Sequence, residues 1–124
     1  MIEVGAHGSV ELMVADDDTA VAFRSGTVPV LATPRVVALV EEASVVALRG
    51  RLAAGETTVG MRIQLDHLAP TPVGAVVVAE AHLEKVEGRR LTFTVSVTDG
   101  RGLVAVGKVT RVVVDEQRFL ERSG

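Results

Sequence analysis

Three polar side chains in this sequence, Thr33, Glu41 and His67, lie where local structure does not require all of them. A histidine can carry a proton near neutral pH, and a carboxylate can act as a base or as a nucleophile. A hydroxyl at the start of a helix lies among N–H groups that favour a carbonyl oxygen developing negative charge. These residue types could therefore support chemistry at a carbonyl group.

Glu41 lies at the edge of the apolar face of a predicted helix. At about 100° per residue, the polar face centres on Arg35, Glu42 and Arg49, and Glu41 falls roughly 100° from that centre. Its neighbours three and four positions away carry no positive charge to pair with it. A carboxylate at an apolar margin costs free energy unless something compensates, and such sites are often functional. The alternative is an interfacial Glu whose carboxylate reaches solvent.

His67 and Thr33 each have a structural and a functional interpretation. His67 ends a strong strand pattern and precedes the proline-containing segment 68–72. A strand end beside a rigid loop is a common place for a reactive side chain, although a single His is also often structural or exposed. Thr33 is expected to be the N-cap of the helix, with Pro34 at the first helical position.

The spacing of apolar residues predicts the elements that position these side chains. The helix beginning at Thr33 carries a broad apolar face, in which Ala43 and Ala47 allow close packing against a sheet. Five segments show strand patterns separated by Gly-containing or Pro-containing breaks. The strands are expected at residues 9–14, 59–66, 75–86, 91–98 and 103–114, with a hairpin turn at residues 87–90. Two of these strands show a regular alternation, with the apolar positions at Val59, Met61, Ile63 and Leu65 in one and at Leu91, Phe93, Val95 and Val97 in the other.

The order of one strand, one long helix and four strands predicts an α+β domain. Turns link the later strands, so the sheet is expected to be mainly antiparallel, with the apolar helix lying against it. A single domain over residues 1–124 is expected from the chain length. The polar tail Asp115–Gly124 is expected to fray, although Phe119 and Leu120 could dock on the body.

Composition excludes several classes of function. The net charge of −3 and the near absence of aromatic residues argue against nucleic-acid binding. The absence of cysteine excludes disulfides and a Cys nucleophile, and three scattered histidines predict no metal site. The sequence shows no membrane-spanning run and no signal peptide at its start, so we expect a cytoplasmic protein without membrane association.

Residues 32–119 resemble hot-dog-fold acyl-CoA thioesterases, and more specifically the fluoroacetyl-CoA thioesterase family. The motif Val86-Glu87-Gly88-Arg89-Arg90-Leu91 carries part of this resemblance. The other matching residues are Thr33, Glu41, Ala43, Gly60, His67, Ala69, Thr71, Pro72, Gly74, Val95, Ser96, Asp99, Gly100, Arg111 and Phe119. The resemblance implies a five-stranded sheet wrapped around one long central helix.

The resemblance also implies a homodimer in which two sheets join, with active sites at the dimer interface. It assigns Thr33, Glu41 and His67 as the catalytic group. It further implies that Gly60 brings backbone close to the thioester and that Arg111 lines the substrate pocket. Members of the fluoroacetyl family carry Phe residues before the helix as a lid, whereas no Phe lies between Phe23 and the helix here. We therefore expect broader acyl-CoA hydrolysis.

The expected reaction is hydrolysis of an acyl-CoA thioester to the free acid and coenzyme A. Glu41 would either activate water or attack the carbonyl carbon, and these two roles stay open. No cofactor is expected, because coenzyme A is part of the substrate. Arg89 and Arg90 could contact its phosphates or form an ordinary charged hairpin. The alternatives are a hot-dog hydratase or dehydratase acting on acyl thioesters, and a non-catalytic acyl-CoA-binding dimer.

Overall fold

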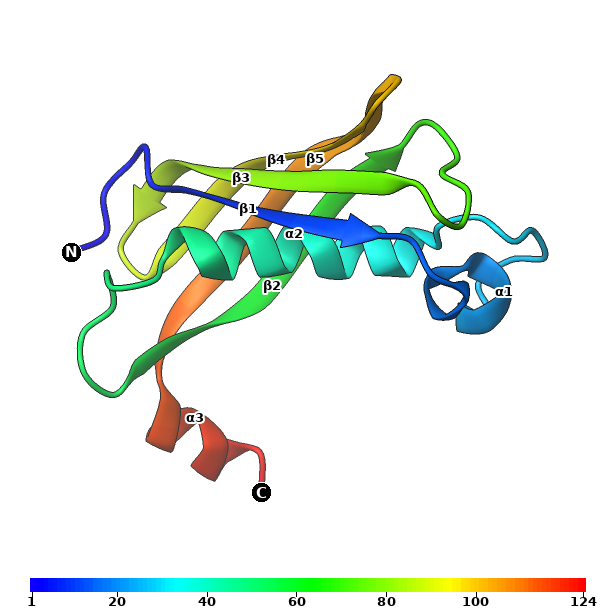
Figure 1. Cartoon of the computed structure of the whole chain (residues 1–124). Helices are drawn as coiled ribbons and strands as arrows, with labels where there is room; N and C mark the ends of the chain where they lie inside the picture. Colours follow the sequence, from blue (N-terminus) through cyan, green and yellow to red (C-terminus); the bar gives the residue numbers. More distant parts are fainter.

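A computed structural model describes residues 1–124 as a five-stranded antiparallel sheet that curves around one long helix (Figure 1). The spatial order of the strands is β1-β3-β4-β5-β2, so β1 and β2 form the two edges. This arrangement confirms the predicted α+β fold. The elements are β1 His7–Met13, a 3-10 turn Asp16–Asp18, α1 Ala20–Phe23, α2 Thr33–Ala47, β2 Glu56–His67, β3 Val76–Glu87, β4 Arg90–Asp99, β5 Gly102–Asp115 and α3 Glu116–Arg122.

Helix α2 packs closely on the sheet because small residues face each other. Ala43 and Ala47 are buried on α2, as their place on the apolar face predicted. A Cβ atom on Gly8 of β1 would lie 2.5 Å from the backbone nitrogen of Ala47 and 2.6 Å from the carbonyl oxygen of Ala43. The glycine therefore allows the backbone of β1 to touch the backbone of α2.

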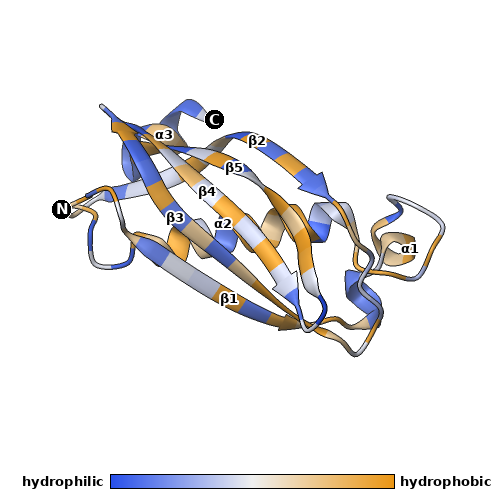
Figure 2. Ribbon diagram, turned by 90° about the horizontal axis from the view of Figure 1, so that it is seen from above, coloured by the Kyte–Doolittle hydropathy of each residue, from blue (hydrophilic) through white to orange (hydrophobic).

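Valine, alanine and leucine side chains supply most of the core beneath α2. Along β4, Leu91, Phe93, Val95 and Val97 are buried on one face, which confirms the predicted alternation. Figure 2 shows the resulting alternation of hydrophobic and hydrophilic residues along the strands. Phe93 is the only aromatic side chain in this core. Burial of β-branched and aliphatic side chains thus holds the helix in the concave face of the sheet.

The regular alternation predicted for β2 is wrong at Met61. Gly60 pairs with Arg111 of β5 and Arg62 pairs with Thr110, so Met61 is an extra residue in a β-bulge. Its side chain is 43% exposed. A bulge of one residue reverses the phase of the alternation. Even-numbered positions before Met61 and odd-numbered positions after it therefore share one face of the strand.

The tail differs from the frayed segment that was expected, because most of it forms helix α3. The Asp115 side chain accepts a hydrogen bond from the backbone N–H of Arg118 at 3.0 Å, which caps the first turn. Figure 1 shows α3 projecting away from the sheet. Phe119 and Leu120 remain 38% and 59% exposed, so neither side chain is buried against the body of this chain.

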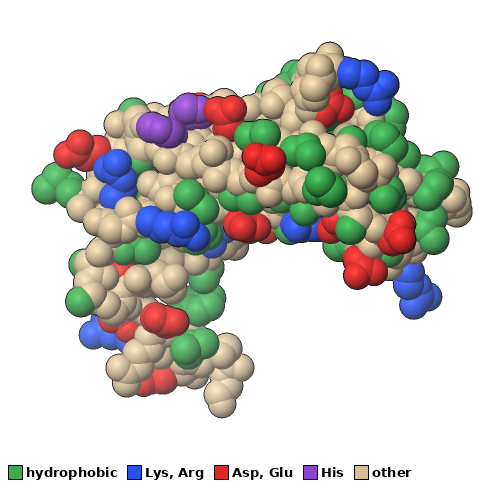
Figure 3. All heavy atoms as spheres, in the orientation of Figure 1, with side chains coloured by type: hydrophobic (Ala, Val, Ile, Leu, Met, Phe, Trp, Pro, Cys, Tyr) green, Lys and Arg blue, Asp and Glu red, His purple; other side chains and the backbone are tan.

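The surface carries charges of both signs. Figure 3 shows acidic and basic side chains interspersed over one face of the molecule. That face therefore has no continuous basic surface. None of the helices has the length and apolar character needed to cross a membrane.

Candidate active site

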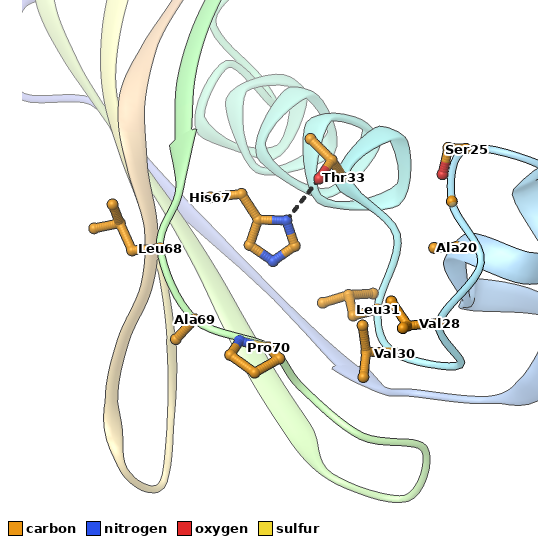
Figure 4. A pocket seen from close by; sticks show the side chains of 11 residues that line it. Ala20, Ser25, Val28, Val30, Leu31, Thr33, His67, Leu68, Ala69 and Pro70 are labelled. Atoms are coloured by element: carbon orange, nitrogen blue, oxygen red, sulfur yellow. Dashed lines mark hydrogen bonds between the residues drawn. The ribbon is translucent and has the colours of Figure 1, made fainter.

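The end of β2 meets the start of α2, and this contact brings His67 to Thr33. A hydrogen bond of 2.8 Å joins Thr33 Oγ1 and His67 Nδ1 (Figure 4). The prediction that Thr33 caps the helix is wrong: Ala32 occupies the N-cap position, and no side chain caps this end. Thr33 is the first helical residue, and its hydroxyl is directed to the imidazole instead.

A cavity of about 330 Å³ opens beside this pair. Figure 4 shows the imidazole of His67 facing a loop that carries Val28, Val30 and Leu31. The lining residues are Ala20, Ser25, Gly26, Val28, Val30, Leu31, Thr33, His67, Leu68, Ala69 and Pro70. The cavity therefore combines a mainly apolar wall with one titratable side chain, which is typical of small-molecule sites.

His67 presents one free nitrogen near this cavity. Nδ1 is engaged by Thr33, whereas Nε2 is buried and has no hydrogen-bond partner. Burial lowers the pKa of His67 below its usual value of 6.5, and the backbone of Ala69 opposes part of this shift. This shift favours the neutral form of the imidazole. A neutral imidazole held through one nitrogen can exchange a proton through the other.

Glu41 belongs to a second polar cluster further along α2. The Nη1 group of Arg111 donates a hydrogen bond of 3.1 Å to Glu41 Oε2. Arg111 is only 6% exposed, whereas the side chain of Glu41 is 35% exposed. Burial lowers the pKa of the Arg111 guanidinium, and the charge of Glu41 opposes this shift. Glu41 has no positively charged partner on α2, and Arg111 on β5 supplies one.

Gly60 completes this second cluster by providing space. A Cβ atom at Gly60 would lie 2.4 Å from Glu41 Oε2, closer than real side chains approach. The backbone of Gly60 does not have a positive φ, so glycine is needed here for space and not for conformation. The carboxylate therefore occupies the position that a side chain on β2 would fill.

The bulge at Met61 places both clusters on the helix side of β2. Gly60 and His67 are seven positions apart, so in a regular strand their side chains would point to opposite faces. The extra residue Met61 between them reverses the alternation, so both residues face the same side of the strand. Bulges are common next to active sites for this reason.

The two clusters remain separate within one chain. Glu41 follows Thr33 by eight residues on α2, which corresponds to about 12 Å along the helix axis. Gly60 and His67 lie roughly 20 Å apart along β2. The structure thus joins Thr33 to His67, and Glu41 to Gly60 and Arg111, but it does not bring Glu41 to His67 within the chain.

Sequence reasoning missed one polar residue of the second cluster. Thr58 accepts a hydrogen bond from Arg111 Nε at 2.9 Å. A signal was present, because Thr58 lies two residues before Gly60 and must share its face in a strand. The strand was expected to begin at Val59, so Thr58 lay outside the predicted element.

The curved antiparallel sheet, the central helix and the polar residues at its start and middle together define a hot-dog domain with a thioesterase-like site. The chain belongs to the fluoroacetyl-CoA-specific thioesterase family, whose sequence profile matches residues 14–117. The fluoroacetyl-CoA thioesterase of Streptantibioticus cattleyicolor is 40% identical over 90 residues. That alignment covers 73% of this chain and 65% of the relative's length.

Solved structures show the same similarity over nearly the whole chain. A crystal structure of a variant of the fluoroacetyl-CoA-specific thioesterase FlK, in complex with fluoroacetate and CoA, is 32% identical with a TM-score of 0.88. The match covers 95% of this chain and 99% of that one. A hot-dog-like protein from Thermanaerovibrio acidaminovorans is 31% identical with a TM-score of 0.86, covering 98% and 93% of the two chains.

Proposed function

We propose that this protein hydrolyses an acyl-CoA thioester to the free acid and coenzyme A. The observation that carries the proposal is the Thr33–His67 hydrogen bond at an apolar cavity, with Nε2 of His67 left unpartnered. Membership of a thioesterase family supports the same reaction class. The crystal structure of the related enzyme with fluoroacetate and CoA supports an acyl-CoA substrate.

In the proposed reaction, a bond forms from an oxygen nucleophile to the carbonyl carbon, and the carbon–sulfur bond breaks. Glu41 either activates water or attacks the carbon itself, in which case water then hydrolyses the acyl-enzyme. His67 transfers a proton, and the departing sulfur leaves as the free thiol. Thr33 and the backbone near Gly60 polarise the carbonyl oxygen. Arg111 fixes the Glu41 carboxylate through their ion pair, and no metal or redox cofactor takes part.

We further propose that the reaction site forms between two copies of the chain. Glu41 and His67 lie in separate clusters, so a shared mechanism requires a second Glu41 to reach this His67. Strand β2 supports such an arrangement because it is 12 residues long, lies at an open edge of the sheet and exposes Met61. Antiparallel pairing of two β2 strands would continue the sheet and place the two helices side by side.

Steady-state thiol release over a panel of acyl-CoAs tests the proposed activity. Glu41→Gln removes the carboxylate charge and His67→Ala removes the proton carrier, so each should lower kcat by about 100-fold or more. Glu42→Gln is the matched control, because Glu42 is exposed on the same helix and contacts neither cluster. Thermal unfolding confirms that each variant is folded.

The same panel separates the alternative functions. A hydratase or dehydratase would change absorbance at the enoyl band without releasing thiol. A non-catalytic binding dimer would bind acyl-CoA and do neither. If folded Glu41→Gln and His67→Ala both retain the wild-type rate of thiol release, the proposed mechanism is wrong.

A further inference from the structure

We propose that Thr58 is a positioning residue for hydrolysis, because it holds the guanidinium of Arg111 in the orientation that fixes Glu41. This inference rests on the proposed function, since it assigns Thr58 a role in that reaction. Thr58 lies on β2, two residues before Gly60, and does not itself reach the proposed reacting atoms. It acts on Glu41 only through Arg111.

Thr58 binds one whole edge of the Arg111 guanidinium. The Nε group of Arg111 donates to Thr58 Oγ1 at 2.9 Å, and the Nη2 group donates to the Thr58 carbonyl oxygen at 3.0 Å. A planar guanidinium held by two donors on one edge cannot rotate without breaking both bonds. The third nitrogen, Nη1, is thereby directed at Glu41 Oε2, at 3.1 Å.

The carboxylate depends on this single contact for its position. Glu41 makes no side-chain hydrogen bond other than the one from Arg111, and its side chain is 35% exposed. Gly60 leaves open space where a Cβ atom would lie 2.4 Å from Oε2. A flexible side chain at the edge of the core with one partner would otherwise sample several rotamers. The orientation of Arg111 therefore determines where Glu41 lies.

The contact with Arg111 also gives the two carboxylate oxygens of Glu41 different roles. Oε2 is occupied by Arg111, which leaves Oε1 for a water molecule or for the thioester carbon. Attack requires the reacting atoms to be about 3–3.5 Å apart with good alignment, so small displacements of the carboxylate reduce the rate strongly. The hydroxyl of Thr58 contributes to that alignment from outside the reaction site.

The decisive comparison is between Thr58→Val and Thr58→Ser. Valine keeps the shape of threonine but removes the acceptor for Nε, whereas serine keeps the acceptor. We expect Thr58→Val to lower kcat about tenfold, as loss of one hydrogen bond to a charged group implies, with KM changed by less than about twofold. Thr58→Ser should restore most of the wild-type kcat.

Thr57→Val is the matched control for the loss of a hydroxyl from β2. Thr57 is one residue earlier, faces the opposite side of the strand and makes no side-chain hydrogen bond, so its kcat should equal that of the wild type. Melting temperatures are measured in parallel. If Thr58→Val does not fold at the assay temperature, Thr58→Cys replaces it, because a thiol is only a weak acceptor and the same fall in kcat is expected.

A double variant tests whether Thr58 acts through Arg111. Adding Thr58→Val to Arg111→Lys should lower kcat far less than it does in the wild type, because lysine cannot make the two-bond contact. Wild-type kcat in Thr58→Val, no rescue by Thr58→Ser, or full additivity with Arg111→Lys would each overturn the role of Thr58. If the wild-type protein releases no thiol from any acyl-CoA, the proposed function itself fails, and the inference fails with it.

Discussion

At the scale of single residues, the chemical properties of the site depend on which polar groups are buried and which residues they contact. His67 loses solvent but keeps one hydrogen bond, whereas Arg111 loses solvent and gains a carboxylate. Gly60 contributes only the space that a side chain would occupy. Each of these features follows from contacts between elements that are distant in the sequence.

Gly60→Ala should leave the protein folded but lower its rate of thioester hydrolysis. The new Cβ atom would lie 2.4 Å from Glu41 Oε2, which is the far end of a flexible side chain and can move aside. We expect a loss of about 1–3 kcal/mol in the free energy of unfolding, because the displaced carboxylate weakens its bond to the buried Arg111, and a fall in kcat of about 100-fold, because the carboxylate leaves its position. Denaturation and thiol release measure the two effects. An alanine variant with wild-type kcat would show that the position of Glu41 is unimportant.

His67 should make the protein less stable as the pH falls below 6.5. Burial lowers the pKa of His67 in the folded state, so below pH 6.5 the unfolded chain binds a proton that the folded chain does not. The free energy of unfolding therefore decreases from pH 6.5 down to the folded-state pKa and is not reduced further by this group below it. Chemical denaturation between about pH 7 and pH 5 should show a weaker pH dependence for His67→Gln than for the wild type. Identical pH dependence would contradict the shift.

At the scale of elements, the helices and strands that show a local periodicity could be predicted from the sequence. Features that depend on how strands pair could not. The helix from Thr33, the β4 alternation and the turn at residues 87–90 follow local patterns and were predicted. The bulge at Met61 was not, because apolar residues at alternate positions through 65 look like a regular strand. The Glu41–Arg111 ion pair joins residues 70 positions apart, so it depends on strand register and helix placement together.

Gly8→Ala should destabilise the contact between β1 and α2. A Cβ atom there would lie 2.5 Å from backbone of Ala47, which cannot move without shifting the helix. We expect a loss of about 1–3 kcal/mol in the free energy of unfolding, the usual cost of overpacking. Ser9→Ala, at the next position and exposed, should stay within about 0.5 kcal/mol of the wild type. Equal stability of the two variants in urea denaturation would contradict the close packing.

At the scale of the whole molecule, the proposed function assigns substrate choice to the cavity beside His67 and assembly to the open edge formed by β2. The three Phe residues of the chain are Phe23, Phe93 and Phe119, and none of them lines the cavity beside His67. Its wall is formed mainly by smaller aliphatic side chains on the loop before α2. The wall of the cavity therefore contains no aromatic side chain of this chain.

Fluoroacetyl-CoA and acetyl-CoA should be hydrolysed with similar efficiency. Replacing one hydrogen by fluorine changes the size of the acyl group little, and an aliphatic cavity wall offers no specific device to distinguish the two groups. We expect the two kcat/KM values to agree within about 100-fold, measured by thiol release under the same conditions. A preference of many thousands for fluoroacetyl-CoA would require a recognition element that this cavity lacks.

The proposal that two chains share one reaction site is tested most directly by measuring thiol release from a mixed dimer. This dimer combines a Glu41→Gln chain with a His67→Ala chain and is isolated through two different affinity tags. Each homodimer should be inactive. A two-fold symmetric dimer holds two equivalent sites at its interface. In the mixed dimer, one of these two sites combines the wild-type Glu41 of one chain with the wild-type His67 of the other, so we predict about half the wild-type rate of thiol release per dimer. A mixed dimer as inactive as both homodimers would contradict a reaction site shared between two subunits.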